Sequence, residues 1–383
     1  MKAIISSTHT RLITALDLLL VFSILLGALA LGSCNISQSS QETQISTQAA
    51  SPSEVEKLTP TEAATKEDDM LSIETYLPAD PEDAGGEGFY EDEYYIWNGQ
   101  AFSLFFGGEA SARRYASFID TAAEKMGDGI TTFALIVPIN SEFLLPQRLL
   151  SGENSVDTDS QADFMRTAYT SIDSSAVPVN PYNLLSSHCR EYIYFASDHH
   201  WTGLGAYYAY TAFAGTAGLP ALSLDDCEEQ TVDSFTGSIT RVVNAELNTD
   251  SVSYWQLPYA VTDDITTEDG EVLHFDTCYY EAMPSGEDVY SLFLMGDYPL
   301  EHIHSESDSV CGKKIAVIHE SFGNAFVPYL TYNYEDIYSI DFRYWSGDLS
   351  EFCKENGIDD VLIMTNIMFC ANRSILDSIE NIL

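Results

Sequence analysis

Positive charge is scarce in this sequence. Only 16 lysine and arginine residues stand against 59 aspartate and glutamate residues, which gives a formal net charge of -43 over 383 residues. A surface with this charge repels nucleic acid phosphates and anionic lipid headgroups, so neither is expected as a direct electrostatic partner. We interpret the charge as a source of solubility outside the cell.

Sequence patterns of the common metal sites are also missing. The seven cysteines form no CxxC pair, and no HExxH segment occurs. His199 and His200, together with Glu301, His302 and His304, offer ligands at a spacing that could suit zinc. Adjacent histidines rarely point at one ion, however. We therefore expect no metal ion and no other cofactor.

Apolar residues, by contrast, make up 45% of the chain and aromatic residues 12%. A chain of this length and composition can bury a sizeable core, in one large domain or in two ordinary ones. No internal repeat divides it. The composition therefore indicates a folded globular part that has to be located along the chain.

The N-terminus has the features of an export signal. Lys2 and Arg11 form a weakly positive start, an apolar run extends from Leu18 to Leu31, and Gly32-Ser33-Cys34 follows in the form of a lipobox. We expect residues 1–33 to be a lipoprotein signal peptide. Acyl chains on Cys34 would then anchor the protein at the extracellular face of the cytoplasmic membrane. An uncleaved membrane anchor or an ordinary signal peptide is the alternative.

The segment 34–88 has a different composition from the rest. It is rich in Ser, Thr, Gln, Glu and Pro and has few large apolar residues. Such a segment buries too little surface to offset its ordering entropy, so we expect a flexible acidic stalk. The folded domain is expected at residues 89–383. The six cysteines beyond Cys34 fix no disulfide connectivity, and Cys370 is expected to be a buried thiol.

Strands alternate with helices in the folded part. Periodic apolar patterns predict helices, and short apolar runs predict buried strands. Helices are expected at 110–126, 203–215, 324–330 and 349–355, and strands at 131–137, 314–319, 336–341 and 361–365. This order predicts an α/β fold with a parallel sheet flanked by helices. Residues 222–308 are expected to be strands and loops that decorate this core.

Ser321 lies between the predicted strand KIAVIH and the next helix. A strand-to-helix turn exposes its side chain at the sheet edge and directs backbone N–H groups and the helix dipole at a developing charge. A serine nucleophile with an oxyanion hole needs this environment. A serine that only caps the helix is the structural alternative.

The segment Asp198-His199-His200-Trp201 offers a general base with a carboxylate partner. A catalytic histidine needs a carboxylate that fixes its tautomer and stabilises the imidazolium. In an extended segment, Asp198 and His200 point to the same side, whereas His199 points away. His200 is therefore the expected base. The alternative is a structural loop in which Asp198 caps the next helix and the histidines pack under Trp201.

Polar residues near other predicted strand ends are further candidates. Arg343 follows one strand, Asn366 follows another, and Asn324 begins the helix after Ser321. All three are oxyanion or substrate-binding candidates. Neutralising nearby acids is the alternative role for Arg343, and forming a turn is the alternative for Asn366. Asn140 and Ser141 are expected to be structural.

The segment YFASDHHWTGLGAYY, residues 194–208, resembles the signature of the DHHW-motif proteins. These are SGNH-hydrolase-like exported proteins of Gram-positive bacteria, similar to the alginate O-acetyltransferase (AlgX/AlgJ-like) domain. The resemblance extends in matching order to LIVPINSEFLLP, VNPYNLL, ESFGNAFVPYL and DFRYW. It spans about Tyr95 to the C-terminus, and the long signature is its most specific part.

The resemblance implies Asp198 and His200 as acid and base and Ser321 as nucleophile. Asp and His precede Ser here, a permuted order that the alginate-acetylating relatives share. His319-Glu320 stands where the family usually has Lys-Asp, and Ser197 where Thr is usual. The additional methylene of Glu320 puts the family's oxyanion geometry in question.

The expected function is O-acyl transfer, with acetyl as the expected acyl group. An acyl-serine would pass its acyl group to a cell-surface polysaccharide in a transferase, or to water in an esterase. In the transferase, a membrane-bound O-acyltransferase would supply the acyl group. The alternatives are a catalytically inactive carbohydrate-binding or assembly lipoprotein, and a structural surface protein.

Overall fold

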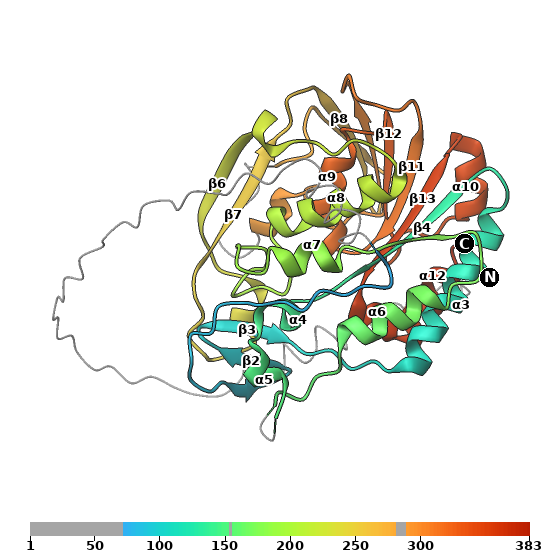
Figure 1. Ribbon diagram of the computed structural model, residues 1–383. Helices are drawn as coiled ribbons and strands as arrows, with labels where there is room; N and C mark the ends of the chain where they lie inside the picture. Colours follow the sequence, from blue (N-terminus) through green and yellow to red (C-terminus); the bar gives the residue numbers. More distant parts are fainter. Residues whose placement is uncertain (1–71, 153–154, 281–288) are drawn as a thin grey trace, which may run out of the picture. The chain divides into compact units, whose positions relative to one another are not determined.

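The computed structural model describes residues 72–152, 155–280 and 289–383 (Figure 1). The expected signal peptide, Cys34 and most of the expected stalk lie outside these residues. Within the described ranges, no helix is both long and apolar enough to cross a membrane. The cysteines of these ranges are free thiols, and Cys370 is buried, as expected.

An eight-stranded sheet forms the centre of the domain, in the order β5-β4-β13-β11-β12-β10-β8-β9. The first five strands run parallel and are here called the parallel half: β5 (Val177–Val179), β4 (Thr131–Val137), β13 (Asp360–Asn366), β11 (Lys314–His319) and β12 (Asp336–Asp341). Three antiparallel strands continue the sheet and are called the antiparallel half: β10 (Leu300–Ser305), β8 (Val261–Thr266) and β9 (Val272–Phe275).

The expectation of a wholly parallel sheet, with residues 222–308 only decorating it, is therefore wrong for the antiparallel half. Strands β13, β11 and β12 are almost continuously buried, the pattern of a sheet covered on both faces. In β10 and β8, buried residues alternate with more exposed ones, as in an antiparallel sheet with one wetter face. Such an alternation of polar and apolar residues resembles the pattern of surface loops.

Helices cover both faces of the parallel half (Figure 1). One side carries α8 (Gly203–Ala217) and α9 (Phe322–Leu330), which contact each other. The other side carries α3 (Glu109–Met126), α10 (Leu349–Asn356), α11 (Ile367–Ala371) and α12 (Arg373–Glu380), and α6 (Gln161–Thr170) packs on α3. The expected helices at 110–126, 203–215, 324–330 and 349–355 are confirmed, with ends that differ by at most two residues.

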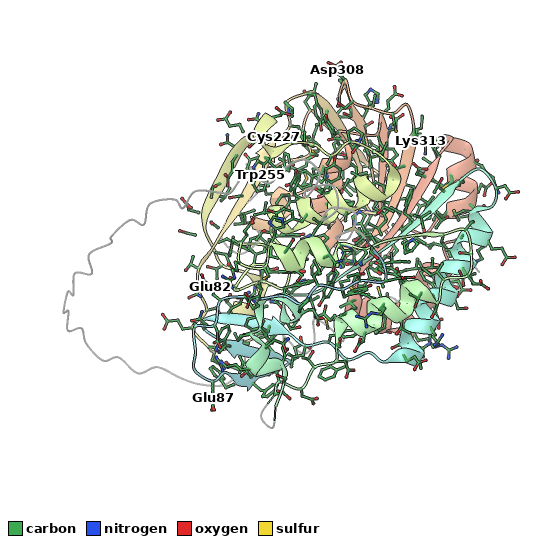
Figure 2. All side chains as sticks on the ribbon, in the orientation of Figure 1. Glu82, Glu87, Cys227, Trp255, Asp308 and Lys313 are labelled. Carbon is green, nitrogen blue, oxygen red and sulfur yellow. The ribbon has the colours of Figure 1, made fainter. Side chains whose placement is uncertain are left out.

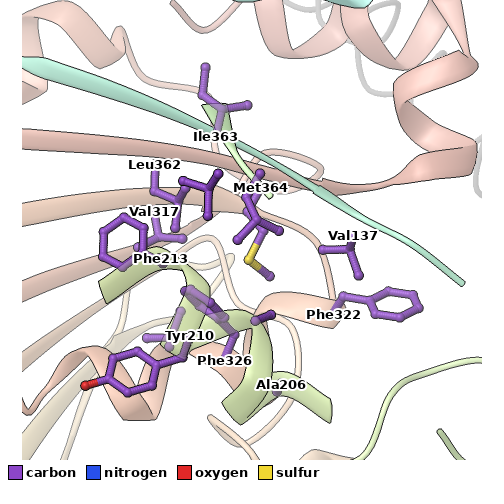
Figure 3. Close-up of a cluster of buried hydrophobic side chains, with 14 of the residues drawn as sticks. Val137, Ala206, Tyr210, Phe213, Val317, Phe322, Phe326, Leu362, Ile363 and Met364 are labelled. Carbon is purple, nitrogen blue, oxygen red and sulfur yellow. The ribbon is translucent and has the colours of Figure 1, made fainter. Parts of the chain in front are cut away.

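The core between the sheet and α8 and α9 is built from aromatic and aliphatic side chains (Figure 3). Tyr210 and Phe213 of α8 and Phe326 of α9 lie near Val317 and Met364 of the sheet. Each of these side chains is fully buried, and burying a large apolar side chain stabilises a fold by about 1.5–3 kcal/mol. This packing fixes the start of α9, and with it Ser321, relative to α8.

Two smaller sheets lie outside the main one. Strands β1 (Phe89–Glu91), β2 (Tyr94–Trp97) and β3 (Gln100–Ser103) form an antiparallel meander. Strands β6 (Glu228–Phe235) and β7 (Asp250–Gln256) form an antiparallel pair, to which Trp255 belongs (Figure 2). The remaining elements are short: α4 (Ser141–Leu144), α5 (Gln147–Leu150), α7 (Tyr182–Ser187), η1 (Leu224–Asp226), η2 (Ser238–Arg241) and η3 (Val289–Leu292).

Residues before position 89, where the sequence pattern placed the start of the domain, already pack on the domain. Asn183 of α7 accepts a hydrogen bond from the Leu77 amide at 2.9 Å and donates one to the Thr75 carbonyl at 2.7 Å. The Tyr76 ring lies 4.8 Å from that of Tyr182. Composition did not reveal this docking, because an extended segment can be held by its backbone groups whatever its side chains are.

Candidate active site

The Asp198–His200 loop lies just before α8 and is held from several sides. Thr202 caps α8 by accepting a hydrogen bond from the Gly205 amide at 3.2 Å. Trp201 is fully buried, and its indole N–H donates to the Phe322 carbonyl at 3.0 Å. This bond ties the loop directly to the first turn of α9, the helix that follows Ser321.

Ser321, His200 and Asp198 form one hydrogen-bonded chain. The His200 Nε2 atom lies 2.7 Å from Ser321 Oγ, and its Nδ1 atom lies 2.7 Å from Asp198 Oδ1. Asp198 and His200 are buried, whereas Ser321 is partly exposed. The juxtaposition expected from the sequence is therefore present, with the hydroxyl at the accessible end.

The Asp198 carboxylate is surrounded by donors. Its second oxygen accepts hydrogen bonds from the Ser238 amide at 2.9 Å and the Ser238 hydroxyl at 2.7 Å. Burial alone would raise the pKa of Asp198, but the adjacent histidines and Ser238 hold it well below its usual value. An ionised Asp198 assigns the His200 proton to Nδ1, which leaves Nε2 free to accept the Ser321 proton.

His199 does not point away from His200, as an extended segment would require. The two rings lie side by side with centroids 3.9 Å apart, and His199 Nδ1 lies 3.3 Å from Ser238 Oγ. The segment is bent because Asp198 Oδ1 also accepts the His200 backbone N–H at 3.1 Å. His200 is nevertheless the histidine that reaches Ser321, as expected.

Asp250 supports this loop from β7. Its carboxylate accepts hydrogen bonds from the Ala196 amide at 2.7 Å, the Ser197 amide at 2.8 Å and the Ser197 hydroxyl at 2.5 Å. The Ser197 hydroxyl also accepts a bond from the Gly237 amide at 2.8 Å. Threonine, the usual residue at position 197, supplies the same hydroxyl. Asp250 was missed in the sequence because no local pattern distinguishes it from the many other acids.

Tyr290 was missed as well. Its ring stacks on His200 with centroids 3.9 Å apart and an interplanar angle of 6°, and its hydroxyl donates to the Ser321 carbonyl at 3.0 Å. Burial raises the pKa of Tyr290 well above its usual value, so the hydroxyl keeps the proton that it donates. Tyr290 therefore contacts both His200 and the Ser321 backbone.

Ser321 occupies the cap position of α9 but does not cap it with its side chain. The adjacent Glu320 carboxylate accepts hydrogen bonds from the Phe322 amide at 3.1 Å and the Asn366 amide at 2.9 Å, and lies 3.4 Å from Ser321 Oγ. Glu320 thus connects the Ser321 turn to the end of β13. The Ser321 hydroxyl remains directed at His200.

Glycine is needed at position 323. A Cβ atom there would lie 2.2 Å from the Nδ1 atom of His319, which is buried beneath the turn. His319 bonds through Nε2 to Ser339 Oγ at 2.7 Å. Where the family usually has lysine, this chain therefore has the buried ring of His319, which makes contacts within the domain.

The weaker candidates have different surroundings. Asn324 donates through its side-chain amide to Gly296 at 3.1 Å and to Asp297 at 2.9 Å. Arg343 pairs with Asp341 at 2.5 Å and with Asp297 at 2.7 Å. Both side chains are close to the site but already bound to protein groups.

Asn366 caps α11 through its side-chain oxygen, which accepts the Phe369 amide at 3.1 Å. Within the described ranges the side-chain nitrogen of Asn366 has no hydrogen bond, whereas its backbone N–H donates to Glu320. Asn140 is structural, as expected, because it bonds to Ser103 and Ala101 of β3. Ser141 accepts a bond from Gln161 at 3.2 Å and is likewise structural.

The histidines considered for zinc lie at opposite ends of the parallel strands. His302 and His304 bond to Asp336, at the amino end of β12, at 2.9 and 3.1 Å. Ser321 follows the carboxyl end of the neighbouring strand β11. Ligand atoms of Asp198, His199 and His200 do lie within 4.8 Å of one another. Both nitrogens of His200 are already used, however, so the geometry favours the Ser–His–Asp chain over a metal site.

Comparisons with known proteins agree with this fold. A solved DHHW family protein from Eubacterium siraeum is 27% identical, with a TM-score of 0.68, over 79% of this chain and 99% of that one. Bacillus cereus PatB1, solved with a sulfonyl adduct, is 15% identical, with a TM-score of 0.58, over 71% and 93% of the two chains. This second likeness concerns the fold alone.

The O-acetyltransferase domain of Pseudomonas putida AlgJ is more distant. It is 12% identical, with a TM-score of 0.40, over 77% of this chain and 98% of that one, and this likeness carries no argument. A comparison with curated proteins finds no match. The family model described as DHHW protein matches residues 84–340, well over half of the chain. The protein therefore belongs to the DHHW family.

Proposed function

We propose that this protein is a serine-dependent O-acyl-transferring enzyme with a permuted SGNH-hydrolase-like site. The observation that carries the proposal is the chain of two 2.7 Å contacts from Ser321 through His200 to Asp198. A hydroxyl, an imidazole and an ionised carboxylate in this order form an activated nucleophile. The partial exposure of Ser321 supports access of an ester to the hydroxyl.

In the first half-reaction, His200 Nε2 takes the proton of Ser321 while Oγ forms a bond to the acyl carbon. The tetrahedral intermediate then collapses, the ester C–O bond breaks, and His200 returns the proton to the leaving oxygen. In the second, His200 deprotonates an acceptor hydroxyl that attacks the acyl-serine. The acyl group moves to the acceptor, and Ser321 regains its proton from His200.

The hydrogen bonds around Ser321 narrow the choice of oxyanion donors. The backbone N–H groups of Phe322 and Asn366 donate to Glu320. The side-chain amide of Asn324 donates to Gly296 and Asp297. We assign the role to the backbone N–H of Ser321 and the side-chain nitrogen of Asn366. Neither has a hydrogen bond within the described residues.

The proposed substrate is a cell-surface polysaccharide that is O-acetylated or deacetylated. In the transferase case, a membrane-bound O-acyltransferase would supply the acyl group, and a lipid on Cys34 would keep both proteins at the extracellular face of the membrane. Transfer to sugar requires exclusion of water from the acyl-serine, which distinguishes a transferase from an esterase.

One observation favours a second candidate, a carbohydrate-binding or assembly protein with an inactive site. The Glu320 carboxylate lies 3.4 Å from Ser321 Oγ and occupies the Phe322 amide. A negative charge at this place opposes the developing oxyanion. In an inactive relative, the hydrogen-bonded chain would persist as a structural feature without supporting acylation.

Acyl-serine trapping separates the two candidates. We expect the purified protein to gain one acyl or phosphonyl group from p-nitrophenyl acetate or a fluorophosphonate, as measured by intact mass and located at Ser321 by peptide mapping. Ser321→Ala should abolish the label and His200→Ala should reduce it strongly. The control Ser378→Ala, on an exposed position of α12, should label normally. A folded wild type that takes no label supports the binding protein instead.

A further inference from the structure

Acidic side chains dominate the surroundings of Ser321. Asp198 comes from the loop before α8, Glu320 from the turn after β11, Asp341 from the end of β12, and Asp297 from the segment between η3 and β10. The only cationic side chain in direct contact with this group, within the described ranges, is that of Arg343. Besides the two histidines His199 and His200, the site thus holds four carboxylates and one guanidinium.

The Arg343 guanidinium is already paired on two sides. Its Nε atom donates to Asp341 Oδ1 at 2.9 Å, and its terminal nitrogen contacts Asp341 at 2.5 Å and Asp297 at 2.7 Å. Asn324 holds the other Asp297 oxygen at 2.9 Å. A carboxylate on a substrate would have to compete with two fixed carboxylates for this cation. Arg343 therefore does not provide a receptor for a second anion.

Asp297 is the most accessible of these acids. About 28% of its side chain is exposed, against 1% for Asp341 and 5% for Asp198. Burial opposes its ionisation, but Arg343, Asn324 and His200 keep the pKa of Asp297 below its usual value. Asp297 is therefore charged at neutral pH, and its hydrogen bond to Asn324, three residues after Ser321, places it beside the first turn of α9.

We propose that the Ser321 site accepts uncharged or cationic esters and sugars and discriminates against anionic ones, with Asp297 as the main determinant. This inference rests on the proposed acyl transfer and specifies its substrate class: a neutral acyl group, and a neutral or amino-sugar polymer in place of a uronate-rich one. Because the site has more carboxylates than cationic groups, a substrate anion is repelled and its local concentration is lowered.

The test compares matched aryl acetates that differ only in charge: p-nitrophenyl acetate, a carboxylated nitrophenyl acetate and a trimethylammonium-substituted phenyl acetate. Each rate of Ser321 acylation is divided by the rate of the same ester with free imidazole, which removes intrinsic reactivity. At low salt, we expect the anionic ester to be disfavoured by about five- to tenfold, and the gap to shrink at about 0.5 M salt because the charges are screened.

Asp297→Asn should reduce the discrimination to about two- to threefold, because it removes one charge and keeps a hydrogen-bonding oxygen. The control Asp269→Asn removes an exposed charge in the β8–β9 turn and should leave the ratio unchanged. Equal normalised rates for all three esters, at both salt concentrations, would overturn the charge selection and leave acyl transfer standing. No acylation by any ester would overturn the proposed function and this inference with it.

The acceptor step is checked in the same way. A neutral oligosaccharide and an oligouronate compete for the acetyl-enzyme, and the acetylated products are counted by mass spectrometry. We expect the neutral sugar to receive most of the acetyl groups at low salt. Preference for the oligouronate would contradict the proposal.

Discussion

The two halves of the central sheet use polar residues in different ways. In the parallel half, most strand residues are apolar, and the polar candidates lie at or just beyond the carboxyl ends of the strands. Asn366 is the last residue of β13, and Ser321 and Arg343 follow β11 and β12. In the antiparallel half, ionisable residues lie within the strands: Asp263 in β8 and Glu301 in β10 on one face, His302 and His304 on the other. We therefore assign the proposed chemistry to the first half and expect pH-dependent stability from the second.

The largest expected effect concerns the carboxyl edge of the parallel half. Ser321→Ala or His200→Ala should lower the rate of acyl transfer about 10³-fold or more, since removing one member of such a chain removes its joint action. Stability should change little for Ser321→Ala. The measurements are ester turnover and urea unfolding. The matched control is His274→Ala, an exposed histidine of β9, which should retain full activity. If Ser321→Ala keeps activity near the wild-type level, Ser321 is not the nucleophile.

The next effect concerns the buried acids of the antiparallel half. Burial raises the pKa of Asp263 to about 7, and burial together with Asp263 raises the pKa of Glu301 well above its usual value. Asp263 and Glu301 interact with each other by a side-chain hydrogen bond, and within the described residues no other group bonds to the buried atoms Asp263 Oδ1 and Glu301 Oε2. The two carboxyl groups are adjacent in the interior, so the folded state favours their protonated forms.

The sign of the pH effect follows from these shifts. Between about pH 4 and pH 7 the folded state binds more protons than the unfolded state, so the free energy of unfolding should fall as pH rises, by about 2–3 kcal/mol. Glu301→Gln should flatten this dependence because Asp263 then has an amide neighbour that can donate to it. Urea unfolding at pH 5 and pH 8 measures both proteins. A wild type that is more stable at pH 8 than at pH 5, with Glu301→Gln unchanged, would contradict this account.

A smaller effect is expected at Tyr290, which contacts both His200 and the Ser321 backbone. Tyr290→Phe keeps the stack on His200 and loses the hydrogen bond to the Ser321 carbonyl, so kcat should fall about three- to tenfold with little change in KM. Tyr290→Leu also removes the stack on His200, so kcat should fall further. Comparing kcat and KM of the two variants separates the contribution of the hydrogen bond from that of the stack. Equal activity of the wild type and both variants would show that Tyr290 only fills space.

The smallest effect is expected at the wetter face of the antiparallel half. His304 contacts Asp336 at 3.1 Å, with 44% of the histidine side chain exposed, and Lys314 also pairs with Asp336. His304→Ala should cost less than about 1 kcal/mol of stability and should leave acyl transfer unchanged. Thermal unfolding and ester turnover check the two parts. If His304→Ala lost acyl transfer, the assignment of the proposed chemistry to the parallel half alone would be wrong.

Sequence patterns predicted most of the parallel half because its longer strands contain continuous apolar runs and are followed by helices, whereas the three-residue β5 was not predicted. The strand at 131–137 and the helices near 110 and 203 were located to within two residues. The antiparallel half was not predicted as part of the sheet, because β8 and β10 alternate buried and more exposed residues and because their pairing connects residues far apart in the chain. Glu301 pairs with Ile265 on one side and with Ser339 on the other, and no local pattern encodes such a register.

The site shows the same division. The Asp198–His200 pair is a local contact, and its residues were identified from spacing and from the resemblance to the DHHW family. The bent loop that places His199 beside His200 was not expected, because it depends on the Asp198 side chain and on Ser238, which lies 40 residues later. Asp250, Tyr290 and Asp297 had no signal of their own in a chain with 59 acids and 23 tyrosines.

The sequence by itself determined the strand–turn–helix around Ser321, the adjacency of Asp198 and His200, and the scarcity of positive charge. These are local or compositional properties, and short-range sterics, periodicity and residue counts specify them. Only the tertiary structure decided that His200 meets Ser321 across 121 residues, that Tyr290 stacks on that histidine, and that Asp297 neutralises Arg343. Such contacts depend on how the buried faces of α8, α9 and the sheet pack, and packing is a property of the whole core.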